Sequence, residues 1–229
     1  DKGVANVNLA RHHVHAVLSL AGASACGIGR DELVEVLWPG SSAAAGRNRL
    51  YHTVHLARQA LSAAAWDDAW LTVRLGHVVL DERVWCDARQ PDRAQERNMA
   101  DLDAPALHAL LPLCGLDWMP ELDVGPLGES VRARLRGIQV RVLREAAVRI
   151  RDQGDTPVLR AHLQQLIRLE ATDESAHREL MQLDLAAGRR HAVLRRYETC
   201  ARELTLQLGL RPTAETSAVA ELAATARRL

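Results

Sequence analysis

Apolar and polar residues follow a helical period along most of the chain, and strand-like alternation is confined to short stretches of its first part. The clearest helical segment runs from Ala43 to Leu61 and has two different faces. Residues three or four positions apart share one face of a helix, so this segment divides into an apolar and a polar stripe. The apolar stripe holds Leu50, Val54, Ala57 and Leu61, and the polar stripe holds Asn48, His52, His55 and Gln59. We expect a long amphipathic helix whose apolar stripe lies in a core.

The polar stripe of this segment has an unusual composition for a solvent-exposed face. Its side chains all donate or accept hydrogen bonds, and three arginines border it, namely Arg47, Arg49 and Arg58. Asp and Glu do not occur between Ala43 and Leu61, although charged side chains of both signs dominate most solvated helix faces. Polar side chains of this kind bind base edges in the major groove, and guanidinium groups bind phosphates. The stripe therefore predicts contact with DNA, with an ordinary solvated face as the alternative.

The segments before residue 43 predict the preceding elements of a helix-turn-helix. Val4–Leu9 alternates as a short strand would, and Arg11–Ala21 has the pattern of a first helix. Arg30–Trp38 combines early acidic residues with apolar spacing, which is typical of a short helix. The turn Pro39–Ser42 ends this helix and places Ser42 where it can cap the long helix. A short helix, a turn and a longer helix in this order predict a helix-turn-helix.

A hairpin is predicted directly after the long helix. Trp70–Leu75 alternates, Val78–Leu80 is apolar, and Gly76-His77 between them is a turn candidate. A hairpin in this position is the wing of a winged helix-turn-helix, and its tip carries Arg74 and His77 as candidate DNA contacts. With those of the long helix, the expected DNA-binding residues are Arg47, Asn48, Arg49, His52, His55, Arg58, Gln59, Arg74 and His77.

The remainder of the chain predicts an all-helical domain, because strand patterns are not found after Ala104. The expected helices are Leu107–Leu113, Gly128–Asp152, Thr156–Leu169, Glu174–Ala187, Arg190–Leu208 and Ala214–Arg228. Stops rich in glycine, aspartate or proline separate the later helices, at a spacing close to that of tetratricopeptide repeats. The polar stretch Ala88–Asp103 around Pro91 is the expected boundary. We therefore expect two domains, at 1–90 and 91–229.

Composition limits the possible partners and compartment. Lys plus Arg and Asp plus Glu number 29 each, so DNA contact must depend on local placement of charge. Residues 1–90 hold nine basic and nine acidic residues together with six of the ten histidines. The four cysteines are far apart in the sequence, as expected for buried thiols in a reducing cytosol. The sequence has no membrane-spanning run or signal pattern and starts with Asp1, so we expect a cytoplasmic fragment of a longer protein.

Enzyme and metal chemistry find little support in the sequence. A phosphate-binding loop, a dinucleotide fingerprint, a nucleophile elbow and an HExxH helix are all missing, so we expect neither catalysis nor a cofactor. His12 and His15 share a helix face at a spacing that could hold a metal ion, but a third ligand is not identifiable nearby. We interpret them as surface or capping residues. The tryptophans are interpreted as packing residues, and they are Trp38, Trp66, Trp70, Trp85 and Trp118.

Short motifs in both halves of the chain resemble a known family of regulators. Three motifs of the first half are similar to the OmpR-type winged helix of bacterial activators: Glu35–Pro39, Arg47–Leu50 and Thr72–His77. Three motifs of the second half are similar to the bacterial transcriptional activator domain: Glu170–Met181, Tyr197–Cys200 and Leu208–Thr216. Nearly the whole chain thus resembles the antibiotic-pathway regulators of the SARP family.

This resemblance implies a mainly α protein, in which a winged helix-turn-helix with a small β-hairpin wing precedes an all-α, tetratricopeptide-like domain. It implies a transcription activator that binds double-stranded DNA and whose helical domain forms a homodimer or contacts RNA polymerase. Some positions depart from the family, since His55 and Leu56 replace frequent arginines and Gly76-His77 replaces a Gly-Tyr pair. These departures and the neutral net charge leave a second function open: a protein interaction module of a larger regulator, with little DNA affinity.

Overall fold

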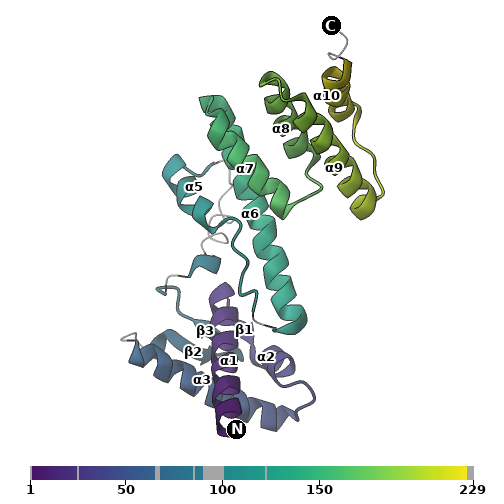
Figure 1. Ribbon diagram of the computed structural model, residues 1–229. Coiled ribbons are helices and arrows are strands. Elements are labelled where there is room, and N and C mark those ends of the chain that lie inside the picture. Colours follow the sequence, from purple (N-terminus) through teal and green to yellow (C-terminus); the bar gives the residue numbers. More distant parts are fainter. Residues whose placement is uncertain are drawn as a thin grey trace. The chain divides into compact units, whose positions relative to one another are not determined.

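The computed structural model describes residues 2–24, 26–64, 68–84, 86–89, 101–121 and 123–225 (Figure 1). The chain divides into two compact units. Unit 1 comprises Asp1–Arg97 and Asp117–Leu135, and unit 2 comprises Asn98–Leu116 and Arg136–Leu229. Helices dominate both units, and the β-sheet of the described residues lies in unit 1. The predicted fold class, a mainly α protein with a small hairpin in its first part, is confirmed.

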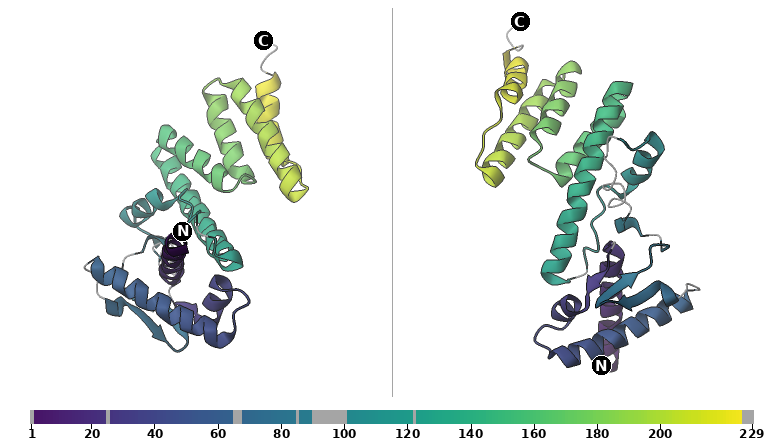
Figure 2. Two further views of the ribbon diagram at one scale, coloured as in Figure 1. Left: turned by 60° about the horizontal axis from the view of Figure 1, so that its bottom comes forward. Right: turned by 180° about the vertical axis from the view of Figure 1, so that it is seen from behind.

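Three helices form the larger part of unit 1 (Figures 1 and 2). They are α1 (Lys2–Ala23), α2 (Arg30–Leu37) and α3 (Ala43–Ala63). Both α1 and α2 pack against α3. The short helix, the turn and the long helix therefore follow one another as the sequence predicts.

The first helix is longer than expected, and the strand predicted at Val4–Leu9 is wrong because that stretch belongs to α1. Val4 and Val7 are three positions apart, as are Val14 and Val17, so the helical spacing continues to the start of α1. An alternation over six residues is a weaker signal than this longer helical period. A strand also needs a partner strand to be stable, and residues 4–9 are not part of the sheet formed by the described residues.

The hairpin predicted after α3 is confirmed, with its turn one residue earlier than expected. β2 (Leu71–Arg74) pairs antiparallel with β3 (His77–Leu80) in a register that places Arg74 opposite His77. The turn consists of Leu75 and Gly76, which both have positive φ, as a type I′ two-residue turn requires. His77, expected in the turn, is instead the first residue of β3.

A third strand, which the sequence pattern did not predict, completes the sheet. β1 (Ile28–Gly29) pairs antiparallel with β3, so the strand order is β1-β3-β2. Two residues are too few to show alternation, and the flanking glycines favour a loop. Two short 3-10 helices, η1 (Asp68–Trp70) and η2 (Asp87–Arg89), precede and follow the hairpin.

One apolar core holds unit 1 together. Its fully buried side chains include Val17, Leu20, Leu33, Leu50 and Leu71, and burial of each contributes about 1.5 to 3 kcal/mol. Residues far along the chain join the same core, namely Val124, Val131 and Leu135. The beginning of α6 (Gly125–Gln153) therefore belongs to unit 1, and the units do not follow the single cut near residue 90 that the sequence suggests.

The tryptophans of the described residues pack as expected. Trp38, Trp70 and Trp118 are partly buried against the core of unit 1. Trp66 and Trp85 lie outside the described residues. The packing interpretation is therefore confirmed for three of the five.

The cysteines follow the prediction of buried thiols only in part. Cys114 and Cys200 are buried, and burial raises the pKa of the Cys114 thiol to about 12 and that of Cys200 to about 11. Cys86 is partly exposed. Cys26 is exposed, so the prediction is wrong there, because Cys26 lies in the turn between α1 and β1 instead of on a packed face.

Unit 2 is a series of helices, and short turns connect those from α6 to α10 (Figure 1). Its helices are α5 (Ala104–Leu110), the later part of α6, α7 (Thr156–Leu169), α8 (Glu174–Ala186), α9 (Arg190–Leu208) and α10 (Ala214–Thr225). Contacts run in succession from α7 to α8, from α8 to α9 and from α9 to α10. The predicted helices are confirmed to within a few residues, and the expected end at Arg228 lies outside the described residues.

Local chemistry explains the helix ends in unit 2. The carboxylates of Asp103, Asp155 and Asp173 accept hydrogen bonds from backbone N–H groups in the first turns of α5, α7 and α8. Pro112 ends α5 early, because proline has no N–H for the helical hydrogen bond, and a short 3-10 helix (Leu111–Leu113) follows.

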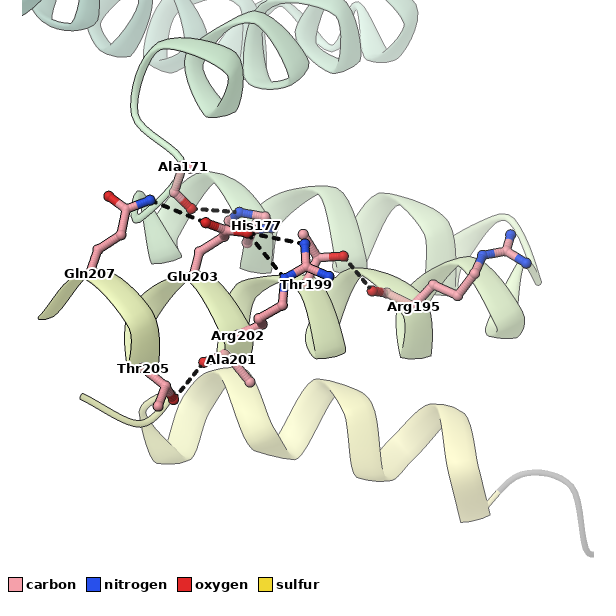
Figure 3. Close-up of polar contacts among 9 residues, drawn as sticks. All are labelled: Ala171, His177, Arg195, Thr199, Ala201, Arg202, Glu203, Thr205 and Gln207. Atoms are coloured by element: carbon pink, nitrogen blue, oxygen red, sulfur yellow. Dashed lines mark hydrogen bonds and ion pairs between the residues drawn. The ribbon is translucent and has the colours of Figure 1, made fainter. Parts of the chain in front are cut away.

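Several polar groups of α8 and α9 form hydrogen bonds. Asp184, only 2% exposed, accepts hydrogen bonds from Arg160 at 2.7 Å and Arg189 at 3.0 Å. Figure 3 shows the contacts along α9, where Glu203 accepts hydrogen bonds from Arg202 at 3.0 Å and from Gln207 at 3.1 Å. In the same view the buried His177 of α8 places its Nε2 atom 3.1 Å from the carbonyl oxygen of Ala171. Among the helices that the structure describes, none is long and apolar enough to cross a bilayer.

Candidate nucleic-acid interface

The first turn of α3 is capped by Ser42 and packs closely against α2. The hydroxyl of Ser42 accepts a hydrogen bond from the backbone N–H of Ala45 at 3.3 Å, so the predicted N-cap is confirmed. Gly46 is buried against Val34 of α2, and a Cβ atom at this position would lie 2.2 Å from Cγ1 of Val34. Glycine therefore allows α2 and α3 to approach closely, as the two helices of a helix-turn-helix do.

The two faces predicted for α3 are present. Leu50, Val54 and Ala57 are at most 2% exposed, and Leu61 is partly buried. Thr53 is also buried on this side, and its hydroxyl donates to the carbonyl of Arg49 at 2.9 Å. The four side chains of the polar stripe are all exposed: Asn48, His52, His55 and Gln59. The stripe is thus free of packing and lies on the side of α3 opposite its buried residues.

The three arginines beside the stripe differ in the protein groups that they contact. Arg47 lies 3.6 Å from the carboxylate of Asp31, and its side chain is 41% exposed. Arg49 is exposed and donates to the hydroxyl of Ser41 at 3.0 Å. Exposed pairs of this kind contribute about 0 to 1 kcal/mol, so both arginines can exchange their partners for a phosphate at little cost. Arg58 is different, because it is partly buried and donates from Nε to the carbonyl of Leu71 at 2.7 Å.

The two wing residues flank the hairpin turn. Arg74 ends β2 and His77 begins β3, and both are exposed. The register pairs them directly across the turn, so their side chains leave the hairpin at one end. Nδ1 of His77 lies 3.2 Å from the carbonyl oxygen of Leu75. The predicted DNA-binding residues therefore form two groups, one along α3 and one at the hairpin tip, and all of them are exposed except the partly buried Arg47 and Arg58.

A contact that the sequence did not predict connects these two groups. The backbone N–H of Arg30 donates to the carbonyl of Gly76 at 2.8 Å, and its Nη1 donates to the hydroxyl of Tyr51 at 2.9 Å. Tyr51 is exposed on α3 and Gly76 is in the turn, so Arg30 holds the hairpin tip beside the exposed part of α3. Sequence reasoning missed Arg30 and Tyr51, because the contact joins residues 21 and 46 positions apart, and periodicity gives no sign of it.

One histidine of the cluster in α1, His13, packs against a tryptophan, whereas His15 is exposed. The rings of His13 and Trp38 lie 4.9 Å apart, centroid to centroid. Burial lowers the pKa of His13, and the nearby His12 and the charge of Arg49 lower it further. Within the described residues, no group of three or more His, Cys, Asp or Glu side chains has metal-binding geometry. His12 and His15 are therefore not brought together with a third ligand in the part of the chain that the structure describes.

Comparisons with known proteins find one matching family model and a similar solved structure. Residues 116–222 match the family model of the bacterial transcriptional activator domain. The solved structure of Mycobacterium tuberculosis EmbR in complex with a low affinity phosphopeptide is similar to this chain, with a TM-score of 0.67 and 19% sequence identity. The similarity covers 95% of this chain and 60% of EmbR, so the chain spans less than two thirds of that protein. A search of curated proteins gives no match.

The two findings agree with the resemblance found in the motifs. The likeness to EmbR, at this level of identity, concerns the fold, and it extends over both units. The family match covers the helices from α6 to α10, which contain the second group of motifs. The match to the bacterial transcriptional activator domain therefore concerns residues 116–222, a little under half of the chain.

Proposed function

We propose that unit 1 binds promoter DNA, with α3 in the major groove and the β2–β3 hairpin as a wing. The observation that carries this proposal is the exposed stripe of Asn48, His52, His55 and Gln59, on a helix without an acidic residue. The major groove admits an α-helix, and a stripe of donors and acceptors matches the donors and acceptors of base edges. In this proposal unit 2 forms a homodimer or contacts RNA polymerase, and the protein acts in the cytoplasm.

The stripe and its borders have different roles in this proposal. Asn48 lies in the second turn of α3, the end that enters the groove first in a helix-turn-helix, and its amide suits adenine. Arg47 and Arg49 lie at the edges of the stripe and bind phosphates, which positions the helix without selecting sequence. Arg74 and His77 do the same from the wing. Because the net charge of the chain is +0, binding depends on this local placement and not on an overall field.

The test is a selection of binding sites from random duplex DNA, followed by titrations of the selected duplex at several salt concentrations. Wild-type protein should enrich a defined sequence, and log K should fall linearly with log salt. Asn48→Ala should flatten the preference at one position by about 1 to 3 kcal/mol. Arg202→Gln is the matched control, because Arg202 is an exposed arginine of α9 in unit 2. Loss of selectivity in Arg202→Gln, or an unchanged binding motif in Asn48→Ala, would contradict the proposal.

A second function, a protein interaction module with little DNA affinity, is favoured by a different observation. Arg47, Arg49 and Arg58 all contact protein groups, so each must exchange or share a partner to bind a phosphate. EmbR, whose fold this chain shares, was solved with a phosphopeptide, although the chain spans only 60% of EmbR. If the selection enriches no sequence, and binding to duplex DNA is absent at low salt, this second function replaces the first.

A further inference from the structure

The tip of the hairpin carries a leucine that the fold does not explain. Leu75 is 100% exposed and has a φ of 48°, in the left-handed region. The first position of such a turn favours Asn, Asp or Gly, because a side chain branched like leucine is strained there. Leu75 thus adopts an unfavourable backbone conformation without burying any of its apolar surface.

Polar side chains flank Leu75, and hydrogen bonds hold the turn in place. Arg74 and His77 flank it in paired register, and both are exposed. Arg30 binds the carbonyl of Gly76, next to Leu75, and reaches Tyr51 on α3. Nε of Arg30 is buried and finds no acceptor within the described residues. An apolar side chain therefore projects from a turn whose neighbours include two arginines and a histidine. The contacts of Arg30 fix the position of this turn relative to the exposed part of α3.

We propose that Leu75 is an apolar wedge that enters the minor groove of the bound DNA and opens a base step. Apolar side chains inserted from this groove partly unstack bases and kink the duplex, while neighbouring cations contact the phosphates that line the groove. Pyrimidine–purine steps are the easiest to open, so Leu75 selects such a step beside the site of α3. This inference rests on the proposed function, because it requires that unit 1 bind duplex DNA.

The test uses Leu75→Asn, for which stability and affinity should change in opposite directions. Asn tolerates the left-handed conformation, so the thermal midpoint of unit 1 should rise by about 2 to 5 °C. All five tryptophans of the chain belong to unit 1, so tryptophan fluorescence reports its unfolding alone. DNA affinity should fall about tenfold, with an unchanged salt slope, because an apolar contact releases no counterions.

Two further measurements test whether Leu75 itself opens the base step. A 2-aminopurine base at the selected pyrimidine–purine step should brighten on binding of the wild type and of Leu75→Met, and should stay dim with Leu75→Asn. Leu206→Asn is the matched control, because Leu206 is an exposed leucine of α9, 74% exposed, and should alter neither affinity nor fluorescence.

The outcomes separate this inference from the proposed function. If the wild type binds a selected sequence and Leu75→Asn binds equally well, the wedge is wrong and the DNA-binding proposal stands. If Leu75→Asn binds equally well but activates transcription less in a purified system, the leucine contacts protein and the wedge is again wrong. If the wild type shows no salt-dependent binding to any duplex, both the proposed function and the wedge are wrong.

Discussion

Nε of Arg58 on α3 donates a hydrogen bond of 2.7 Å to the backbone carbonyl of Leu71, the first residue of β2. Leu71 is fully buried, so this bond ties the hairpin to the helix at the edge of the core. Arg30 forms the second tie, at the other end of the hairpin, where it binds Gly76 and Tyr51. The hairpin is therefore held against α3 at both of its ends, and the two groups of candidate DNA-binding residues keep a fixed relationship.

Replacement of Arg58 should reveal this structural role. Arg58→Ala leaves the carbonyl of Leu71 without its donor, which should lower the free energy of unfolding of unit 1 by about 1 to 2 kcal/mol. The salt slope of DNA binding should remain that of the wild type, because the side chain is committed to the carbonyl. Urea unfolding followed by tryptophan fluorescence measures the first quantity, and anisotropy titrations measure the second. A full unit of lost salt slope with unchanged stability would instead make Arg58 a phosphate contact.

Arg49 should behave in the opposite way. Its bond to the hydroxyl of Ser41 is exposed and weak, so Arg49→Ala should change the stability of unit 1 by less than about 0.5 kcal/mol. Loss of one phosphate contact should lower the salt slope by about one unit and weaken binding to all sequences alike. Arg47→Ala should have the same effect. Ser41→Ala is a suitable control, since it removes the partner of Arg49 and keeps the cation.

Replacement by alanine should change stability in opposite directions at two glycines that lie in helices. Helix propensity alone favours alanine by about 1 kcal/mol. A Cβ atom at Gly46 would lie 2.2 Å from Cγ1 of Val34, a stiff β-branched side chain, so Gly46→Ala should destabilise unit 1 by about 1 to 3 kcal/mol. At Gly137 in α6 a Cβ atom meets nothing within 4 Å, so Gly137→Ala should stabilise the chain by about 0.5 to 1 kcal/mol. Urea midpoints measured by circular dichroism and by tryptophan fluorescence decide both signs, and stabilisation by Gly46→Ala would contradict the close approach of α2 and α3.

The features that the sequence predicts well are those that depend on neighbours along the chain. The faces of α3, the Ser42 cap and the helices after Glu174 all follow from period and capping chemistry. The features it misses join residues far apart: β1 with β3, Arg58 with Leu71, and Arg30 with Gly76 and Tyr51. Such pairs leave no local pattern, because each partner alone fits an ordinary turn or helix.

The extent of unit 1 was missed for the same reason. Val131 and Leu135 have the spacing of any amphipathic helix, and their pattern does not say which core they enter. In the fold they join the core of the N-terminal helices. Two arginines of the same stretch also bind carbonyl groups of unit 1, since Arg134 donates to the carbonyl of Ala23 and Arg132 to that of Met119. The change to a polar composition near Pro91 therefore indicates a polar segment, but unit 1 does not end there, because it also includes Asp117–Leu135.

The last prediction concerns pH and the buried His177 of α8 (Figure 3). Burial lowers the pKa of His177, although the contact with the Ala171 carbonyl and the charges of Asp173 and Glu203 raise it, and the charge of Arg196 lowers it. The folded pKa is thus below the ordinary value of 6.5, so the unfolded chain binds a proton first as the pH falls. The stabilising contribution of the neutral imidazole is fully present above pH 6.5 and is lost as the pH falls from 6.5 towards the folded pKa.

Urea unfolding of unit 2, followed by circular dichroism at 222 nm between about pH 7.5 and 5.5, should therefore show a fall in stability on the acidic side of this range. His177→Gln should be less stable than the wild type at pH 7.5 and should show a shallower fall. His191→Gln is the matched control, because His191 is an exposed histidine of α9, and its fall should equal that of the wild type. An equally steep fall in His177→Gln would assign the acid sensitivity of unit 2 to other groups and would leave His177 with a packing role alone.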